Sequence, residues 1–344
     1  MKVLFLQRDL PCNGNYGGVA TQVHDLANAL IKIGVEVTVA SISGKPEDAA
    51  YEHHKIELPS FVNSSRFLKR YLLGYYFKKI DKEVFDVIHS HGDNFLLFGG
   101  RPQVRTFYGT AFMEFVSART WKRKIAQLIS FLLEWVGALA ADYRTAISPD
   151  TARFLPNVNR IVPCGVDKTV FYPAGVKSEN PTILYVGSVY DRKRGDRLLG
   201  LMPDLRQVYP AIELIVAGPE RVNGAGITYV DRPDRSLLAG LYRKAWLLVS
   251  SSDYEGFGLP ALEAMASGTA VVAVENAGSG YLCGNGKYGT LCSKETLFET
   301  IVEHLGDSDK RKQIAANGAL RAEEFEIIKV AEIYREVYAG VIKK

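Results

Sequence analysis

Two glutamates with seven residues between them bound the stretch whose residue types most clearly suggest a chemical role. Glu255 and Glu263 enclose Gly-Phe-Gly-Leu-Pro-Ala-Leu, and Ala-Met-Ala follows, so a glycine-containing loop leads into a strongly helix-forming run. Backbone amides of this loop would lie at a helix N-terminus, where phosphates bind. A carboxylate can accept two vicinal hydroxyls with its two oxygens. The alternative is that Glu263 complements a helix dipole and Glu255 is a surface charge.

Three consecutive cations form a second candidate. Arg192, Lys193 and Arg194 lie in a loop bounded by Gly187 and Gly195, directly after the apolar run Thr-Ile-Leu-Tyr-Val. Ligands of an open α/β sheet bind outside the carboxyl ends of such strands. Cations at this position would offset the charge that grows on a departing diphosphate. The alternative is a solvated charge cluster, and the sequence does not indicate which two cations would face a phosphate.

A glycine pair opens the first helical pattern. Gly17 and Gly18 stand between Tyr16 and Val19, and Gly-Val-Glu-Val follows the helical run at residues 34–37. Glycines at a helix start allow the backbone to approach a phosphate closely. A short glycine pair can also be only a turn.

The elements that must position these residues fall into two series. Alternation of short apolar runs with helical patterns predicts two doubly wound parallel sheets. The predicted strands cover residues 3–6, 35–39, 86–89 and 103–107 in the first series and 182–187, 212–217, 246–250 and 270–274 in the second. A proline- and glycine-containing linker at 163–173 separates them. We expect domains at 1–170 and 171–324, with a terminal helix in 325–344 that packs on the first.

Composition agrees with two domains and excludes several classes of protein. The chain has 344 residues, 47% of them hydrophobic and 23% charged, which is ordinary for a globular protein of this length. Its net charge of +4 suits a phosphate-bearing ligand and an anionic membrane equally. The four cysteines form no C-x-x-C pair, so we expect a reduced cytosolic chain without a zinc site or a disulfide framework. No apolar run reaches the ~20 residues that span a bilayer.

Two basic, aromatic stretches of the first half stand apart, at residues 66–79 and 121–135. Each could be an interfacial helix resting on anionic lipid. Alternatively, each is a domain helix whose aromatic side chains lie in the core and whose lysines are solvated.

The glutamate segment resembles the E-x7-E motif of the retaining glycosyltransferases of family 4, in which a small polar run such as Val249-Ser-Ser-Ser252 precedes it. The basic loop is similar to that family's segment of a glycine, a basic pair and a glycine. The resemblance covers nearly the whole chain. It implies the GT-B fold: two Rossmann-like domains facing a central cleft, with the C-terminal helix crossing back to the first domain.

The resemblance also implies roles for individual residues. Glu255 would contact the hydroxyls of the donor sugar, Glu263 would accept hydrogen bonds from the ribose, and Arg192 with Lys193 would stabilise the departing diphosphate. The remaining donor-binding candidates contribute mainly backbone or lie near the base: Gly17, Gly18, Gly187, Phe257, Gly258, Leu259 and Val230, the last together with Tyr229 and Arg232.

Several positions depart from the family pattern. Tyr108 stands where many relatives have a histidine that touches the donor sugar, which leaves its role and the identity of the sugar open. Ser188 replaces an arginine, and Cys164 replaces the asparagine of the inter-domain linker. His91 fits the family's histidine at the end of the fourth strand, where capping of the strand and ligand contact are equally good interpretations.

The resemblance implies an enzyme that moves a hexose from a nucleotide sugar to a saccharide or a lipid-linked saccharide, with retention of configuration. We expect a UDP-sugar as the donor, because no residue demands guanine. We expect no metal or other cofactor and no nucleic acid. The enzyme would be cytoplasmic and act in polysaccharide biosynthesis, and a peripheral position on the inner face of the cell membrane stays open. Asp307-Ser-Asp309 matches a metal-binding D-x-D, but the helical run after it favours a helix cap. The alternatives are a non-catalytic sugar-nucleotide or membrane-binding subunit and a sugar-nucleotide epimerase. A dinucleotide oxidoreductase is disfavoured because the first loop lacks G-x-G-x-x-G.

Overall fold

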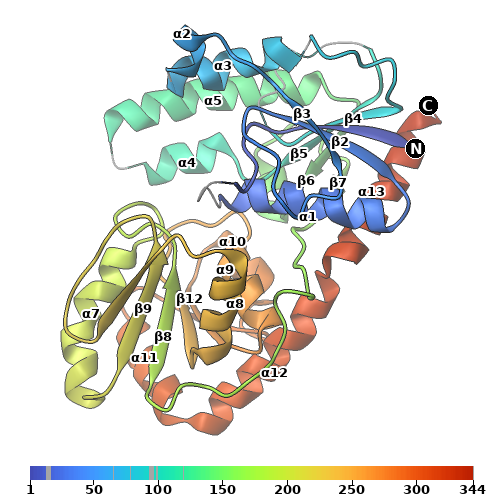
Figure 1. The fold of residues 1–344 in the computed structure, drawn as a ribbon. Coiled ribbons are helices and arrows are strands. Elements are labelled where there is room, and N and C mark those ends of the chain that lie inside the picture. Colours follow the sequence, from blue (N-terminus) through green and yellow to red (C-terminus); the bar gives the residue numbers. More distant parts are fainter. Residues whose placement is uncertain are drawn as a thin grey trace. The chain divides into compact units, whose positions relative to one another are not determined.

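The structure is a computed structural model that describes residues 1–12, 17–64, 66–77, 79–92, 97, 100–118 and 120–343. The chain divides into two compact units, Met1–Gly165 with Ile327–Lys344, and Val166–Glu326. Each unit contains one parallel sheet and the helices that cover it (Figure 1).

The first unit contains a seven-stranded sheet in the order β3-β2-β1-β4-β5-β6-β7. Every neighbouring pair of its strands is parallel. The order runs outward from β1 in both directions, so the switch point of this doubly wound sheet lies between β1 and β4. Its strands are β1 (Lys2–Leu6), β2 (Glu36–Ser41), β3 (Glu52–Lys55), β4 (Val87–Ser90), β5 (Gln103–Phe107), β6 (Tyr143–Ala146) and β7 (Arg160–Ile161).

The terminal helix completes the core of the first unit. Val330, Tyr334 and Tyr338 of α13 are buried in one cluster with β1 and α1 residues such as Phe5 and Leu30. The predicted return of this helix to the first domain is therefore confirmed. The helices of this unit are α1 (Gly18–Lys32), α2 (Ser60–Asn63), α3 (Arg66–Phe77), α4 (Ala111–Ser117), α5 (Trp121–Leu139), α6 (Pro149–Arg153) and α13 (Ile327–Ile342).

The second unit repeats the plan with six parallel strands in the order β10-β9-β8-β11-β12-β13. Its switch point lies between β8 and β11. The strands are β8 (Thr182–Val186), β9 (Glu213–Gly218), β10 (Ile227–Asp231), β11 (Leu247–Ser250), β12 (Ala270–Val274) and β13 (Thr290–Cys292). The helices are α7 (Gly195–Val208), α8 (Arg235–Lys244), α9 (Leu259–Ala266), α10 (Ala277–Leu282), α11 (Leu297–Gly306) and α12 (Ser308–Glu324).

Two Rossmann-like parallel sheets confirm the predicted fold class. Asp307 caps α12 by accepting from the backbone N–H groups of Asp309 and Lys310, so the D-x-D stretch is a helix cap as predicted. Among the described residues, no helix is both long and apolar enough to cross a bilayer.

Candidate active site

Two loops of the second unit leave neighbouring strands at the switch point of its sheet. The basic loop follows β8 and the Glu255 loop follows β11, and these strands pair in parallel, with Ile183 opposite Leu247. Carboxyl ends of parallel neighbours lie at the same edge of a sheet, which is where doubly wound folds bind ligands. The topology therefore brings together two motifs that are about sixty residues apart in the sequence.

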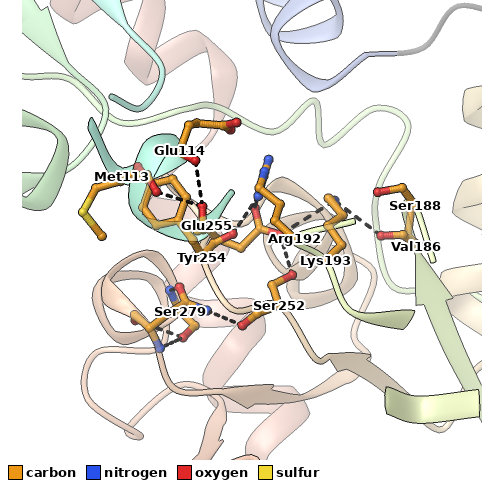
Figure 2. Close-up of polar contacts among 12 residues, drawn as sticks. Met113, Glu114, Val186, Ser188, Arg192, Lys193, Ser252, Tyr254, Glu255 and Ser279 are labelled. Atoms are coloured by element: carbon orange, nitrogen blue, oxygen red, sulfur yellow. Dashed lines mark hydrogen bonds and ion pairs between the residues drawn. The ribbon is translucent and has the colours of Figure 1, made fainter. Parts of the chain in front are cut away.

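Glu255 is the centre of this arrangement (Figure 2). Nη1 of Arg192 donates to its Oε2 at 3.2 Å, and Nζ of Lys193 lies 3.8 Å from its Oε1. The Ser252 hydroxyl donates to Oε1 at 2.8 Å. Arg192 also donates to the carbonyl of Tyr254 at 2.6 Å. One carboxylate thus aligns two cations, and the cluster keeps an excess positive charge that can attract a diphosphate.

Burial sets the electrostatics of Glu255, whose exposed fraction is 8%. Removal from water disfavours the ionised carboxyl, but Lys193, Arg192 and the Ser252 hydroxyl outweigh that effect and lower its pKa below the ordinary value. Glu255 is therefore a carboxylate near neutral pH, an acceptor that suits sugar hydroxyls.

Gly187 gives Lys193 its position. Its φ of +140° lies in the region that favours glycine, and a Cβ at this position would collide with the Lys193 side chain. Nζ of Lys193 reaches the carbonyl of Val186 at 3.4 Å. The absence of a side chain at Gly187 lets the lysine fold back over the loop toward Glu255.

Arg194, the third cation of the run, is turned elsewhere. Its guanidinium pairs with Asp196 at 3.0 Å and with Asp253 at 3.0 Å, and the Asp196 hydrogen bond, supported by Asp253, raises its pKa. Arg197 holds the other oxygen of Asp253 at 2.8 Å. Arg192 and Lys193 are consequently the two members of the run that converge on Glu255.

The start of α9 offers backbone amides without a side-chain cap. Gly258 is its N-cap residue at φ +100°, a conformation that favours glycine. No side chain caps the helix and no acidic residue lies in its first turn. The amides of Phe257, Gly258 and Leu259 are thus at a helix N-terminus suited to a phosphate.

Glu263 lies one turn further along α9. The buried hydroxyl of Tyr242, on α8, donates to its Oε2 at 2.8 Å. Burial and the Glu263 charge raise the pKa of Tyr242 well above its ordinary range, so this tyrosine remains a donor. The hydrogen bond fixes the carboxylate of Glu263, the residue for which the family resemblance implies contact with the ribose.

A pocket lies where these parts meet. It measures about 280 Å³ including space open to solvent, and its wall includes Lys193, Ser252, Glu255, Gly258 and Pro260. The pocket therefore opens between the basic loop, Glu255 and the start of α9.

Four supporting residues were not predicted. Ser252 and Tyr242 hold the two glutamates, as described above. Asn276 caps α10 and donates from Nδ2 to the Ser252 carbonyl at 3.2 Å, and a Cβ on Gly278 would collide with the Glu255 carbonyl. Ser252 was visible in the small polar run after β11, whereas the others come from separate elements and leave no local signal.

The candidates of the first unit lie at the carboxyl ends of its own central strands. Gly17 is the exposed N-cap of α1, which has no side-chain cap and no acidic residue in its first turn. The preceding residues 13–16, including Tyr16, lie outside the described residues. Gly17 and Gly18 therefore retain the helix-start geometry on which the phosphate prediction depends.

His91 and Tyr108 contact each other. Nδ1 of His91 lies 2.9 Å from the Tyr108 hydroxyl. Burial, with the nearby Arg105 charge, lowers the pKa of His91 to about 3, so its imidazole is neutral. Its Nε2 is buried without a hydrogen-bond partner in the described part of the chain. The pair forms a neutral polar contact at the ends of β4 and β5.

Of the residues proposed near the base, Tyr229 and Val230 lie on the edge strand β10, and Arg232 directly follows this strand. Val230 is partly buried, and Tyr229 donates its hydroxyl to the Gly218 carbonyl at 3.1 Å. Gly218, at the end of β9, lies directly against the basic loop, because a Cβ at this position would collide with the Gly187 carbonyl. The strand β9 thus lies between β10 and the basic loop.

Comparison with known proteins identifies the family to which the chain belongs. The family described as "Glycosyl transferases group 1" matches residues 168–321, and "Glycosyltransferase Family 4" matches residues 16–170. The D-inositol 3-phosphate glycosyltransferase of Arthrobacter sp. (strain FB24) is 26% identical over 96% of this chain and 92% of its own. The alpha-maltose-1-phosphate synthase of Mycolicibacterium smegmatis is 26% identical over 99% of this chain and 100% of its own.

A solved structure of HepE from Anabaena in complex with UDP-glucose has the same fold. Its TM-score is 0.76 at 15% identity, covering 99% of this chain and 100% of HepE. The two family matches join near residue 170 and together extend from residue 16 to residue 321. With two parallel Rossmann-like sheets and the Glu255 cluster at the switch point of the second, the chain belongs to glycosyltransferase family 4, with the GT-B fold.

Proposed function

We propose that this glycosyltransferase moves a hexose from a UDP-sugar to a hydroxyl of a saccharide or lipid-linked saccharide, with retention of configuration and without a metal ion. The observation that carries the proposal is the convergence of Arg192 and Lys193 on the buried carboxylate of Glu255 at the β8/β11 switch point.

Each group then has one task in the transfer. The bond between the anomeric carbon and the β-phosphate oxygen breaks, while the acceptor oxygen forms the new bond to that carbon. Arg192 and Lys193 offset the negative charge that develops on the leaving diphosphate, assisted by amides at the start of α9. The proton of the acceptor passes to a phosphate oxygen on the same face of the sugar, so no side-chain nucleophile is needed and configuration is retained.

The two glutamates bind the donor without entering the bond changes. Glu255 accepts hydrogen bonds from the sugar hydroxyls, and Glu263, held by Tyr242, accepts from the ribose hydroxyls. Ionised carboxylates serve both purposes, in agreement with the lowered pKa of Glu255.

Uridine is the proposed base and the cation pair replaces a metal. HepE, which has the same fold, binds UDP-glucose, and no residue near Val230 calls for guanine. Two side-chain cations and a helix start supply the charge that Mg²⁺ supplies elsewhere. The names of two relatives, a D-inositol 3-phosphate glycosyltransferase and an alpha-maltose-1-phosphate synthase, support a hydroxyl-bearing acceptor.

A panel of UDP- and GDP-sugars tests the proposal by calorimetry and by slow donor hydrolysis, with and without EDTA. We expect one UDP-sugar to bind in EDTA, the Arg192→Ala/Lys193→Ala variant to lose about 100-fold or more in turnover, and Glu263→Ala to weaken binding. Lys294→Ala/Lys312→Ala removes the same charge from exposed positions of the second unit and serves as the matched control.

Other outcomes would favour the rivals. Loss of binding in EDTA would contradict metal independence, and preference for a GDP-sugar would contradict the base. Binding without turnover for any acceptor would favour a non-catalytic subunit. Conversion of a donor to its epimer without acceptor would favour an epimerase.

A further inference from the structure

The helix α5 of the first unit has its apolar side outward. Its exposed large side chains follow the spacing of one helical stripe: Trp121, Ile125, Leu128, Leu132, Trp135 and Leu139, with exposed fractions from 43% to 68%. Ile129 and Val136 are also exposed and widen this stripe. We call these eight residues the α5 stripe.

The opposite side of α5, which faces the protein, is polar or small. Gln127, Ser130, Gly137 and Ala138 are the buried residues of the helix. The carboxylate of Glu134 accepts from the backbone N–H of Ala111 at 2.9 Å. This orientation is the reverse of a helix on a water-soluble surface. For Trp121 and Trp135, the interpretation as core aromatics is therefore wrong.

Charges beside the α5 stripe are positive. Lys122 and Lys124 are exposed on either side of it, whereas Arg123 points away and pairs with Glu114 at 3.1 Å. Glu134 is the sole acidic residue of α5, which the structure describes in full, and it lies on the inner side.

We propose that the α5 stripe binds the surface of an anionic lipid bilayer, with the helix lying in the plane of the interface. Apolar side chains would enter the acyl boundary while the two lysines meet anionic headgroups. Tryptophans near both ends of the stripe suit the same interface. Four charged residues keep α5 from crossing the bilayer.

Charge complementarity favours lipid over a second copy of the chain. A copy would bring the same lysines and the same apolar stripe, with no acidic partner on the facing helix. An anionic surface supplies that partner at the N-terminal end of the stripe, where both lysines lie. The inference concerns the first unit alone and goes beyond the proposed transfer reaction.

Co-sedimentation of the full chain with vesicles tests it. Vesicles of phosphatidylcholine are compared with vesicles that also contain the anionic phosphatidylglycerol, at low and high salt. We expect binding to the anionic vesicles that weakens with salt, and a blue shift of tryptophan emission, because Trp121 and Trp135 are two of the three tryptophans.

Exposed positions allow variants that keep the fold. Leu128→Ser/Leu132→Ser should weaken partitioning into vesicles at least about tenfold. Lys122→Gln/Lys124→Gln should reduce the preference for anionic over neutral vesicles about tenfold. Val176→Ser/Leu320→Ser changes exposed apolar residues of the second unit and should bind lipid like the unmodified chain.

Three results would overturn the inference. They are a chain that stays in the supernatant with anionic vesicles, a Leu128→Ser/Leu132→Ser variant that binds as well as the unmodified chain, and a lipid-free dimer that this variant turns into a monomer. Donor binding, measured on the same variants, reports the second unit separately, so failure of the donor site and failure of the lipid site are distinguishable.

Discussion

At Gly187, the space that a methyl group would need is filled by the Lys193 side chain. Gly187→Ala should therefore displace this lysine from Glu255 and strain a backbone at φ +140°, at a cost of about 1–3 kcal/mol of stability. We expect donor turnover to fall more than tenfold while the chain remains folded. Gly200→Ala on α7, where a Cβ meets nothing within 4 Å, is the control for turnover and melting temperature. Equal activity of the two variants would contradict the role of Lys193.

Tyr242 should influence donor binding through its hydrogen bond to Glu263. Tyr242→Phe keeps the buried ring and removes the 2.8 Å hydrogen bond to the carboxylate. A hydrogen bond to a charged group contributes about 1.5–3 kcal/mol, part of which water replaces at the partly exposed Glu263. We expect the donor KM to rise about three- to tenfold with kcat little changed, measured by steady-state kinetics. Tyr209→Phe, which loses a bond to the Val302 carbonyl instead, should leave KM unaltered.

Residue roles could be predicted from the sequence only where a local pattern carried them. The three cations were visible, but only the family resemblance, and no local pattern, singled out Arg192 and Lys193 from Arg194. Its partner Asp253 is 59 residues away, and only the sheet topology brings that carboxylate to the basic loop. The Tyr242 contact was missed for the same reason, because α8 and α9 meet through packing rather than through sequence proximity.

At the scale of elements, the start of α10 supports the Glu255 loop. A Cβ on Gly278 would collide with the Glu255 carbonyl, whereas at Gly280, on the same helix, the nearest atom is 3.8 Å away. Gly278→Ala should shift the loop and lower turnover at least tenfold, and Gly280→Ala should not. Parallel assays of the two variants, with circular dichroism to compare helix content, form the test. Loss of activity in both variants would instead implicate the helix as a whole.

The central strands were predictable because each is a buried apolar run. β1, β2, β4 and β5 of the first unit, and β8, β9, β11 and β12 of the second, all fall within the predicted ranges to within two residues. The strands β3, β6, β7, β10 and β13 were missed. β3 reads Glu-His-His-Lys and is mostly exposed, and β7 has two residues, so neither carries a hydrophobic pattern. The sequence also left open whether the apolar side of α5 packs on the protein or points outward, because helical periodicity identifies an apolar side but not what covers it.

At the scale of the whole molecule, the buried residues His89 and His91 should make the free energy of unfolding depend on pH below neutrality. Burial lowers the pKa of His91 to about 3 and lowers the pKa of His89 well below its ordinary value, and the Arg105 charge contributes to both shifts. The unfolded chain binds a proton at each below about pH 6.5 and the folded chain does not. The free energy of unfolding should therefore fall by up to about 1.4 kcal/mol per pH unit per histidine as pH drops from 6.5 toward 4.

Hydrogen exchange in peptides of β1 and β4, at several pH values, measures this slope for the first unit separately. His91→Gln should reduce it by about 1.4 kcal/mol per pH unit. Tyr108→Phe removes the same hydrogen bond but keeps the imidazole, so its slope should match that of the unmodified chain. An unchanged slope in His91→Gln would show that this histidine is protonated in the folded state.

The division of the chain has a consequence for synthesis. The second unit is one continuous segment, Val166–Glu326, whereas the first is built from the segments on either side of it. On the ribosome, every residue of the second unit emerges before α13 brings Tyr334 and Tyr338 to the first core. The N-terminal domain usually folds first, but here the second unit can be complete before the first. A nascent chain that ends within α13 would contain the whole second unit and an incomplete core of the first unit.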